Sequence, residues 1–418
     1  MSKFSDVLRS RNFFCLWLGQ IISQVGDRLD QMALIAFVYS RSPGSAYEIA
    51  KILSFTIIPV FLIGPIAGVY VDRWDRRKTL FICDFLRAAL VLAIPVFLFY
   101  SKNLTWIYLI IFIVFSIGRF FVPAKLSIVP ELVKKEDLLI ANTLVNATGM
   151  IAAVLGFGVS GVIVEWLGAR SGFFLDSLSF LISGTLIFLI AKKYSIQRSN
   201  VKIGGREIVE VMRKSVLAEI KDGILYFIKN KEIRFTAWMI FALWAALGST
   251  YVVIIVFVQK TLHSATKDLG LLVMFLGIGL FAGSLVYGRF GQRLSHFKTI
   301  FSSLMLSGAM LIIFSVMVHQ YPNFIVAAIF AFLLGIAISP IMIATNTIVH
   351  NASSSSMLGK IFSSLEIVMH LGFLIFMFIS SILAEAFSPF IILVIVGSAI
   401  MFLGLVNLAC QRKVSWLN

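Results

Sequence analysis

Residues 64–78 read GPIAGVYVDRWDRRK, and this stretch decides how the whole chain is expected to fold. Gly64 and Gly68 stand four residues apart at the end of an apolar run, a spacing that lets a second membrane helix approach closely. Asp72 follows where the chain leaves the lipid, a position that suits the positive N-terminus of a neighbouring helix. The basic residues after it mark the cytoplasmic side of a membrane. The stretch therefore predicts two membrane helices joined by a short cytoplasmic loop.

The composition of the whole chain agrees with a membrane protein. Of its 418 residues, 59% are hydrophobic and 13% are charged. Apolar runs of about 20 residues, the length that crosses the hydrocarbon core of a bilayer, recur from end to end. We therefore expect an all-α membrane protein with twelve transmembrane helices. The expected spans lie at roughly 13–40, 46–71, 79–100, 105–131, 138–166, 172–193, 233–259, 266–288, 298–318, 323–351, 357–385 and 388–410.

The positive charge of the chain has the distribution that membrane insertion produces. The net charge is +16, from 36 Lys and Arg against 20 Asp and Glu. When both termini are placed in the cytoplasm, most of the basic residues fall in cytoplasmic segments, as the positive-inside rule requires. We therefore expect cytoplasmic termini and basic loops that face anionic lipid head groups. A nucleic-acid partner is not expected.

Two short patterns recur at similar places in the two halves of the sequence. The Gly-x3-Gly of residues 64–68 returns at 279–283, and the Gly-x4-Pro of residues 118–123 returns at 335–340. Such repetition is typical of transporters built from parallel repeats, and it favours two pseudo-symmetric six-helix bundles. The expected parts are an N-terminal bundle at 1–193, a cytoplasmic linker with an amphipathic helix at 194–232, and a C-terminal bundle at 233–418.

The first expected span carries many polar side chains for a membrane helix. At 100° per residue they share an arc of roughly 120°, which indicates that this side lines a cavity. Two carboxylates one turn apart in a low dielectric favour uptake of a proton near neutral pH, so we expect Asp27, and with it Asp30, to bind a coupling proton or substrate. The alternative is a structural salt bridge from either carboxylate to Arg28 or Arg119. This polar stripe consists of Gln20, Ser23, Gln24, Asp27, Asp30 and Gln31.

Ionisable residues also occur in the third and fourth spans. Asp84 and Arg87 stand three residues apart near the cytoplasmic end of the third span, and we expect them to form a structural or gating ion pair. Arg119 and Lys125 lie in the fourth span. Each is expected either to contact an anionic group of the substrate or to neutralise the carboxylates of the first span.

The C-terminal half is nearly free of charge within its expected spans. Glu366 and His370 stand four residues apart in the eleventh span. One interpretation is a role in coupling or gating, and the other is a solvated position at the mouth of a cavity. Aromatic residues of the seventh span fit either the wall of an apolar binding site or ordinary helix packing; they are Trp238, Phe241, Trp244 and Tyr251.

Sequence motifs for other chemistry are missing. The chain has no P-loop, no nucleophile elbow and no Cys or His spacing typical of a metal site. We therefore expect neither an enzyme nor a resident cofactor or metal. Asp27, Asp30 and His370 leave the alternative of a metal-ion exporter open, and a non-transporting membrane sensor or scaffold is a further alternative.

Residues 64–78 resemble the loop between helices 2 and 3 of major facilitator superfamily transporters, which reads Gly-x3-Asp-Arg-x-Gly-Arg-Arg/Lys. The departure is Asp75, which stands where the family usually has glycine. Residues 121–142 look like the helix 4–5 region of drug:proton antiporters of the macrolide-efflux and enterobactin-exporter type. Residues 156–161, however, lack the proline of the antiporter motif in helix 5, and Pro-Ala-Lys at 123–125 looks like that of bacterial lysophospholipid transporters.

The resemblance also implies a conformational latch on the cytoplasmic side. Asp72 is expected to cap helix 11 in the outward-facing state, and Arg76 is expected to pair with Glu131 at the end of helix 4. Breaking these contacts would open the cytoplasmic side. The other residues assigned to gating are Gly68, Arg73, Arg77, Asp84 and Arg87.

The expected function is that of a secondary active transporter. By resemblance, it exports an amphipathic small molecule of drug or siderophore type by alternating access. Inward proton movement is the expected driving force, with sodium as the alternative ion. We expect a monomer in a bacterial inner membrane, and the competing hypothesis is a lysophospholipid transporter or flippase.

Overall fold

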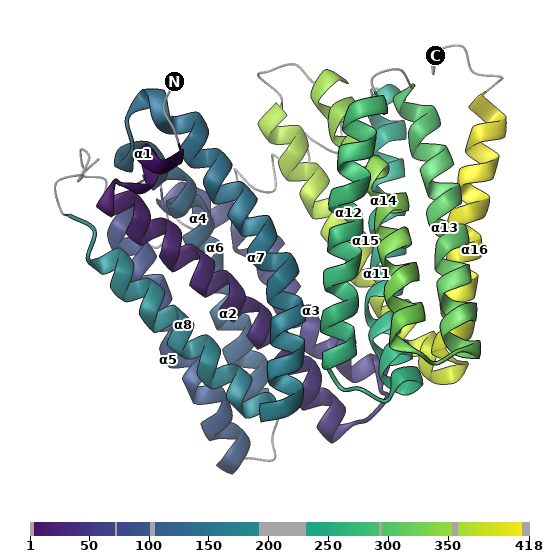
Figure 1. Cartoon of the computed structure of the whole chain (residues 1–418), viewed down its shortest axis with the longest axis horizontal. Coiled ribbons are helices and arrows are strands. Elements are labelled where there is room, and N and C mark those ends of the chain that lie inside the picture. The colour runs from purple at the N-terminus through teal and green to yellow at the C-terminus, as the bar shows by residue number, and fades with distance from the viewer. Residues whose placement is uncertain are drawn as a thin grey trace, which may run out of the picture. The chain divides into compact units, whose positions relative to one another are not determined.

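The computed structural model describes residues 4–71, 73–100, 105–191, 231–291, 295–352 and 358–411 (Figure 1). These ranges are almost entirely helical, so the predicted all-α class is confirmed. The helices are α1 (Phe4–Leu8), α2 (Arg11–Arg41), α3 (Ala46–Leu62), α4 (Gly64–Val71), α5 (Arg76–Tyr100), α6 (Thr105–Leu132), α7 (Leu138–Leu167), α8 (Ala169–Phe188), α11 (Lys231–Leu262), α12 (Lys267–Phe290), α13 (His296–Gln320), α14 (Phe324–Ala352), α15 (Leu358–Ala386) and α16 (Pro389–Gln411). Nearly all of the linker predicted at 194–232 lies outside the described residues.

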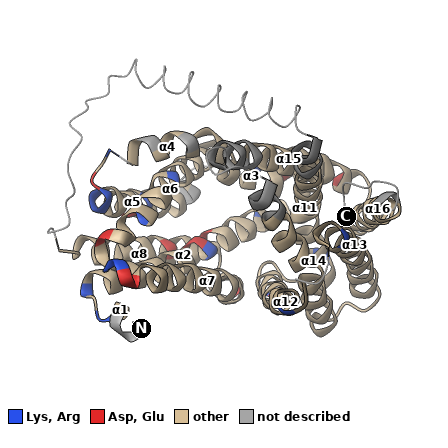
Figure 2. Ribbon diagram, turned by 90° about the horizontal axis from the view of Figure 1, so that it is seen from above, with Lys and Arg blue, Asp and Glu red and all other residues tan. Residues whose placement is uncertain are grey.

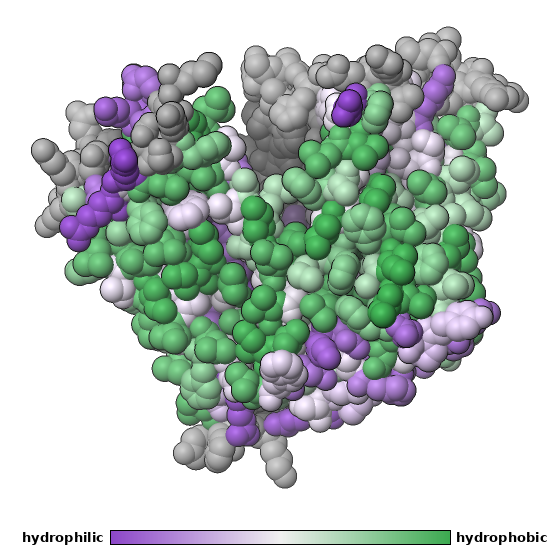
Figure 3. Space-filling model, viewed as in Figure 1, coloured by the Kyte–Doolittle hydropathy of each residue, from purple (hydrophilic) through white to green (hydrophobic). Residues whose placement is uncertain are grey.

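Ten of the described helices are long and apolar enough to cross a membrane, namely α5–α8 and α11–α16. On the face drawn in Figure 3, apolar side chains cover the middle of the helices and hydrophilic ones collect towards their ends. Many large apolar side chains are exposed, for example Phe281 of α12 at 62% and Phe402 of α16 at 65%. Lipid tails are the surroundings that suit such a surface.

The apolar run at 46–71, expected as a single span, is divided at Ile63 into α3 and α4. Pro65 explains the division, because proline has no backbone N–H and leaves the carbonyl four residues before it without a helical hydrogen bond. The N–H of Ile66 bonds instead to the carbonyl of Ile63, at 3.1 Å. The sequence leading into the basic loop is therefore a separate short helix.

Contacts along the chain define two compact units, each described here by itself. Unit 1 contains α1, α2 as far as Phe37, α3 from Ile52 onwards, and α4–α8; unit 2 contains the segment Val38–Lys51 and α11–α16. In Figure 2 the helices α2, α5, α6 and α8 of unit 1 carry many of the coloured charged segments, whereas α12–α14 of unit 2 are mostly tan. The predicted bundle boundaries at 193 and 233 stay a prediction.

Glu385, near the end of α15, connects the segment Val38–Lys51 to the rest of unit 2. Its Oε1 accepts hydrogen bonds from Ser45 Oγ at 2.5 Å and from the backbone N–H of Tyr47 at 3.1 Å. The first N–H groups of a helix have no partner within it, and a negative charge there is favourable. Glu385 therefore acts as a capping group for α3.

Glycines let α12 and α14 pack backbone to backbone within unit 2. A Cβ atom added at Gly279 would overlap the carbonyl oxygen of Phe332, and one at Gly283 would lie 2.8 Å from the carbonyl oxygen of Ile336. Small residues at such positions are the usual means of close helix packing in membranes.

The first Gly-x3-Gly pattern behaves differently from the second. A Cβ atom added at Gly64 or Gly68 would meet no atom of the described chain within 4 Å. The close helix approach that the spacing suggested is therefore not made by these glycines in the part of the chain described.

We expect Gly279→Ala to destabilise the protein, because the new methyl group would overlap the carbonyl of Phe332 and separate α12 from α14. Overpacking of this kind costs about 1–3 kcal/mol, and thermal unfolding of the detergent-purified protein would show a lower midpoint. Gly288→Ala on the same helix is the matched control, since a Cβ atom there meets no described atom within 4 Å. Equal midpoints for the two variants would contradict this packing.

Candidate functional site

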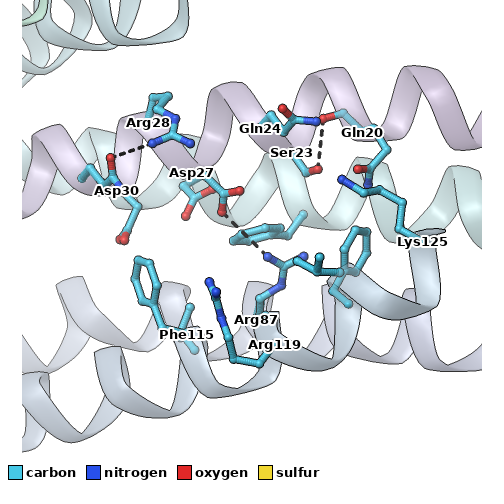
Figure 4. A pocket seen from close by; sticks show the side chains of 17 residues that line it. Gln20, Ser23, Gln24, Asp27, Arg28, Asp30, Arg87, Phe115, Arg119 and Lys125 are labelled. Carbon is cyan, nitrogen blue, oxygen red and sulfur yellow. Dashed lines mark hydrogen bonds and ion pairs between the residues drawn. The ribbon is translucent and has the colours of Figure 1, made fainter. Parts of the chain in front are cut away.

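A polar cavity of about 190 Å³ lies inside unit 1, between α2, α5, α6 and α8 (Figure 4). The whole polar stripe of α2 lines it, together with Arg28, and Arg119 and Lys125 reach it from α6. Arg87 of α5 and Asp176 of α8 also line it, although neither was expected to share a site with the stripe. The apolar part of the wall consists of Val114, Phe115, Phe121, Val122 and Phe180.

Glycines in α2 allow this helix to lie directly against α8. A Cβ atom at Gly26 would overlap Ser179 Oγ and Asp176 Oδ1, and one at Gly19 would lie 3.1 Å from Ser183 Oγ. The polar edge of α8 is thereby placed beside the polar stripe. Elsewhere α2 buries apolar side chains, which hold its orientation; they include Phe13, Leu16, Met32 and Ala33.

Arg87 is a buried cation with two carboxylate partners. Its side chain is 7% exposed, and it forms a hydrogen-bonded ion pair with Asp84 and a longer one with Asp27, from Nη1 to Oδ1 at 3.7 Å. The rings of Phe180 and Phe121 face its guanidinium at 4.1 and 4.8 Å. Carboxylates and ring faces together replace the hydration that burial removes.

The two carboxylates around Arg87 differ in their access to the cavity. Asp84 is completely buried, and its second oxygen accepts a hydrogen bond from Ser183 Oγ at 2.7 Å. Asp27 keeps 39% of its side chain exposed. Asp84 is therefore the fixed partner of Arg87, and Asp27 is the partner that solvent and solutes can reach.

Arg28 binds to its own helix and to α7. Its Nη1 donates a hydrogen bond to Gln31 Oε1 at 2.9 Å, and its guanidinium lies 4.8 Å from the ring centroid of Phe157. The structural salt bridge considered for the first span had Arg28 or Arg119 as its basic partner. In the structure, Asp27 forms an ion pair with Arg87, and a pairing with Arg119 stays a prediction.

Asp30 and Asp176 are buried at the same cavity, with exposed fractions of 4% and 1%. Asp176 accepts a hydrogen bond from Ser179 Oγ of its own helix at 3.2 Å. The sequence analysis missed Asp176. The available signal was that it is the one acidic residue in the span expected at 172–193, and a lone carboxylate in a membrane helix generally has a functional partner.

Arg119 and Lys125 bring positive charge to the cavity from α6. Figure 4 shows the side chains of Arg119 and Lys125 among those that line the cavity. Basic groups of α6 thus face the polar stripe. This arrangement allows either of the two roles expected for them.

The basic loop, residues 73–78, connects α5 to the end of α6. Arg76 forms an ion pair with Glu131, whose side chain is only 9% exposed. Arg73 is exposed, and Asp72 lies outside the described residues. The gating roles of these residues remain predictions.

Arg77 connects the same loop to the end of α8. It donates hydrogen bonds to the backbone carbonyls of Ile187, at 3.4 Å, and of Phe188. The last carbonyls of a helix have no partner within it, and a positive charge there is favourable. In the structure, Arg77 is thus a capping residue for α8.

Asp75, the position at which this chain departs from the family pattern, is the N-cap of α5. Its Oδ1 accepts a hydrogen bond from the N–H of Lys78 at 3.0 Å, and its carbonyl accepts one from the N–H of Thr79 at 2.9 Å. Aspartate is among the preferred N-cap residues because its side chain satisfies an otherwise free N–H group. The loop therefore gains a stable helix start where the family has glycine.

His370 belongs to unit 2 and is not among the residues that line the cavity of unit 1. Its ring packs on Trp244 with centroids 5.5 Å apart. Phe373 of the same helix contacts both Trp244 and Tyr251 of α11, so these aromatic residues pack α11 against α15. The side chain of Glu366 lies outside the described residues, and its coupling with His370 stays a prediction.

Helices of membrane length around a charged internal cavity are the arrangement expected of a membrane transporter. The family model described as transmembrane secretion effector, a branch of the major facilitator superfamily, matches residues 2–349. The chain therefore belongs to this family of major facilitator transporters.

Curated relatives cover most of the chain. It is 27% identical over 346 residues to the transporter YkuC of Bacillus subtilis, covering 81% of this chain and 77% of the relative. It is 22% identical over 382 residues to macrolide efflux protein A of Streptococcus pyogenes, covering 89% of each. A bacilysin exporter of Bacillus subtilis, BacE, is 25% identical over 384 residues, covering 91% of each. The chain is accordingly a multi-pass transporter of the bacterial inner membrane with relatives of the efflux type.

Solved structures agree on the fold. A peptide transporter of the POT family superposes with a TM-score of 0.75 at 14% identity, covering 100% of this chain and 99% of that one. An identity this low supports the major facilitator fold alone.

We expect Asp84→Ala to destabilise the protein strongly, because it removes the hydrogen-bonded carboxylate from the buried Arg87 and leaves the longer ion pair with Asp27. Removing one partner of a buried pair typically costs about 3–5 kcal/mol. Glu48→Gln provides a comparison, since it disrupts the partly exposed contact with Lys51 and should cost less than about 1 kcal/mol. The two unfolding midpoints should differ accordingly, and a wild-type midpoint for Asp84→Ala would show that Arg87 does not depend on this pair.

Proposed function

We propose that the chain exports small amphipathic molecules by alternating access, driven by protons that bind Asp27. The observation that carries the proposal is the unequal pair of carboxylates at Arg87. Asp84 is completely buried and hydrogen-bonded to Arg87. Asp27 Oδ1 lies 3.7 Å from Arg87 Nη1, and 39% of the Asp27 side chain is exposed. Efflux-type relatives support the direction of transport.

The charge of this group supplies a reason for exchange. With both carboxylates ionised, Asp27, Asp84 and Arg87 together carry one net negative charge in a membrane interior, which is costly. A proton on Asp27 removes that charge, and so does the positive end of a bound substrate. The proton and the positive end of the substrate neutralise the same negative charge, so binding of one disfavours binding of the other. Such competition is the condition for antiport.

The wall of the cavity suits an amphipathic ligand. Ionisable side chains from α2, α5 and α6 line the cavity together with the rings of Phe115, Phe121 and Phe180. A molecule with a charged group and an apolar body is complementary to such a lining. Since one unit of one chain contains the whole cavity, we propose that a monomer is sufficient.

The proposed membrane topology has twelve spans. Besides the ten helices that qualify by length and composition, α2 crosses with its polar stripe turned inward, and α3 with α4 crosses as a broken pair. The distribution of basic residues supports cytoplasmic termini. The proposed bundles are 1–193 and 233–418, joined by the linker at 194–232.

We expect Asp27→Asn to abolish uphill export, because asparagine cannot exchange a proton. Proteoliposomes with an imposed proton gradient would be tested with erythromycin, ethidium and a labelled lysophospholipid as probes. Uphill accumulation should fall to the level of empty liposomes, whereas downhill movement of the probe should continue. Asp137→Asn is the matched control, since Asp137 lies outside the cavity and makes no side-chain capping bond.

The outcomes of this experiment separate the alternatives. Uphill export by Asp27→Asn at the wild-type rate would refute the coupling role of Asp27. Movement of the lysophospholipid without any movement of the two drugs would favour a lipid flippase. Export driven by a sodium gradient alone would show that the coupling ion is sodium and not the proton.

We also propose that the Arg76–Glu131 ion pair is part of the cytoplasmic latch, with Gly68, Asp72 and Arg73 as further members. Arg76→Glu or Glu131→Arg should each lower the export rate, because each places two like charges in contact. The double exchange should recover part of that rate, with a coupling energy of about 0.5–3 kcal/mol in a double-mutant cycle. Additive losses in the double variant would mean that the contact has no role in transport.

A further inference from the structure

The cavity of unit 1 contains a second acidic site beside the Asp27–Arg87 pair. Asp30 and Asp176 line it from α2 and α8 and are 4% and 1% exposed. Asp30 Oδ1 is buried and has no hydrogen-bond partner within the described residues. In the same part of the chain, neither carboxyl group forms an ion pair. A buried acceptor without a donor indicates that something absent from the protein chain satisfies it.

Gly26 lets Asp176 of α8 approach α2 one helical turn from Asp30. A Cβ atom at this position would overlap Asp176 Oδ1, so this oxygen lies against α2 at position 26. Asp30 is four residues further along α2, and helical side chains lean back over the residue four positions earlier. The carboxyl group of Asp30 is therefore directed to the turn of α2 that Asp176 touches.

The charged groups around the pair have other contacts or approach from other helices. On α2, Arg28 donates to Gln31, and Asp27 is paired with Arg87 of α5. Arg87 in turn is held by Asp84, and Arg119 and Lys125 reach the cavity from α6. Two neighbouring carboxylates, both buried and both ionised, would repel each other in a low dielectric. One proton between them removes most of that cost.

We propose that Asp30 and Asp176 bind one proton between them and form a second protonation site of this transporter. One carboxyl group becomes an acid whose O–H donates to the other carboxylate, so the charge of the pair changes from −2 to −1 and no other bond changes. The inference rests on the proposed proton-coupled function. The cavity then has two kinds of proton site: Asp27 is open to solution and paired with a cation, and the Asp30–Asp176 pair is shielded and shared.

Infrared difference spectroscopy of the purified full-length chain tests the shared proton directly. A protonated carboxyl group has a C=O stretching band that moves in heavy water, whereas ester bands of lipid do not. At neutral pH the wild type should show this band. Asp30→Asn and Asp176→Asn should each remove it, because the asparagine amide donates to the remaining carboxylate and keeps it ionised.

Two controls bracket this result. Asp27→Asn should keep the band, because Asp27 belongs to the separate ion pair with Arg87 and not to the Asp30–Asp176 pair. Glu136→Gln, at an exposed position in the turn before α7, should also keep it. If Asp176→Asn retains the wild-type band, the proton belongs to Asp30 alone and the shared site is refuted. A wild type without the band at neutral pH refutes it as well.

A measurement on the wild type alone covers the case in which the variants fail to fold. The band should be the same in excess sodium chloride and in excess choline chloride. Its loss in sodium would overturn the proposal and identify the pair as a sodium site. Because the spectrum needs no transport, it is independent of the export assay: uphill export by Asp27→Asn would refute the proposed function and leave the band unchanged.

Discussion

The guanidinium of Arg87 is the group on which the arrangement of unit 1 depends. A permanently charged side chain inside a membrane protein must be surrounded by counter-charges and polarisable groups. Here they come from four helices: Asp84 from α5 itself, Asp27 from α2, the ring of Phe121 from α6 and the ring of Phe180 from α8. Satisfying one cation thus specifies which faces of the other three helices point inward.

The cavity is a consequence of this same requirement. Polar side chains of α2 have to face the cation, and glycines at positions 19 and 26 let α8 approach them closely. Arg119 and Lys125 reach the same region from α6. A space of about 190 Å³ remains beside Asp27, so the region that surrounds the buried cation is also the region with room for a solute.

Much of this arrangement is predictable from sequence, and the exceptions have physical reasons. The polar stripe of α2 is readable because a helix repeats every 3.6 residues, and all six of its members line the cavity. The pairing of Asp27 with Arg87 cannot be predicted from the sequence, because the two residues are distant in the chain and meet only through the packing of α2 and α5. Asp176 has no periodic pattern around it, so only its isolation in an apolar span marks it. The division of α3 from α4 was visible in Pro65, but hydropathy alone hides it.

The basic loop at residues 73–78, which resembles the family motif, also has a structural role, because its side chains contact the ends of three helices. Asp75 caps the N-terminus of α5, Arg76 forms an ion pair with Glu131 at the end of α6, and Arg77 donates hydrogen bonds to the last carbonyls of α8. Substitutions in this motif consequently loosen the scaffold at the same time as they disturb any switching between states. Loss of transport in such a variant therefore has two separable origins, and only a variant that retains the wild-type unfolding midpoint reports on the switch.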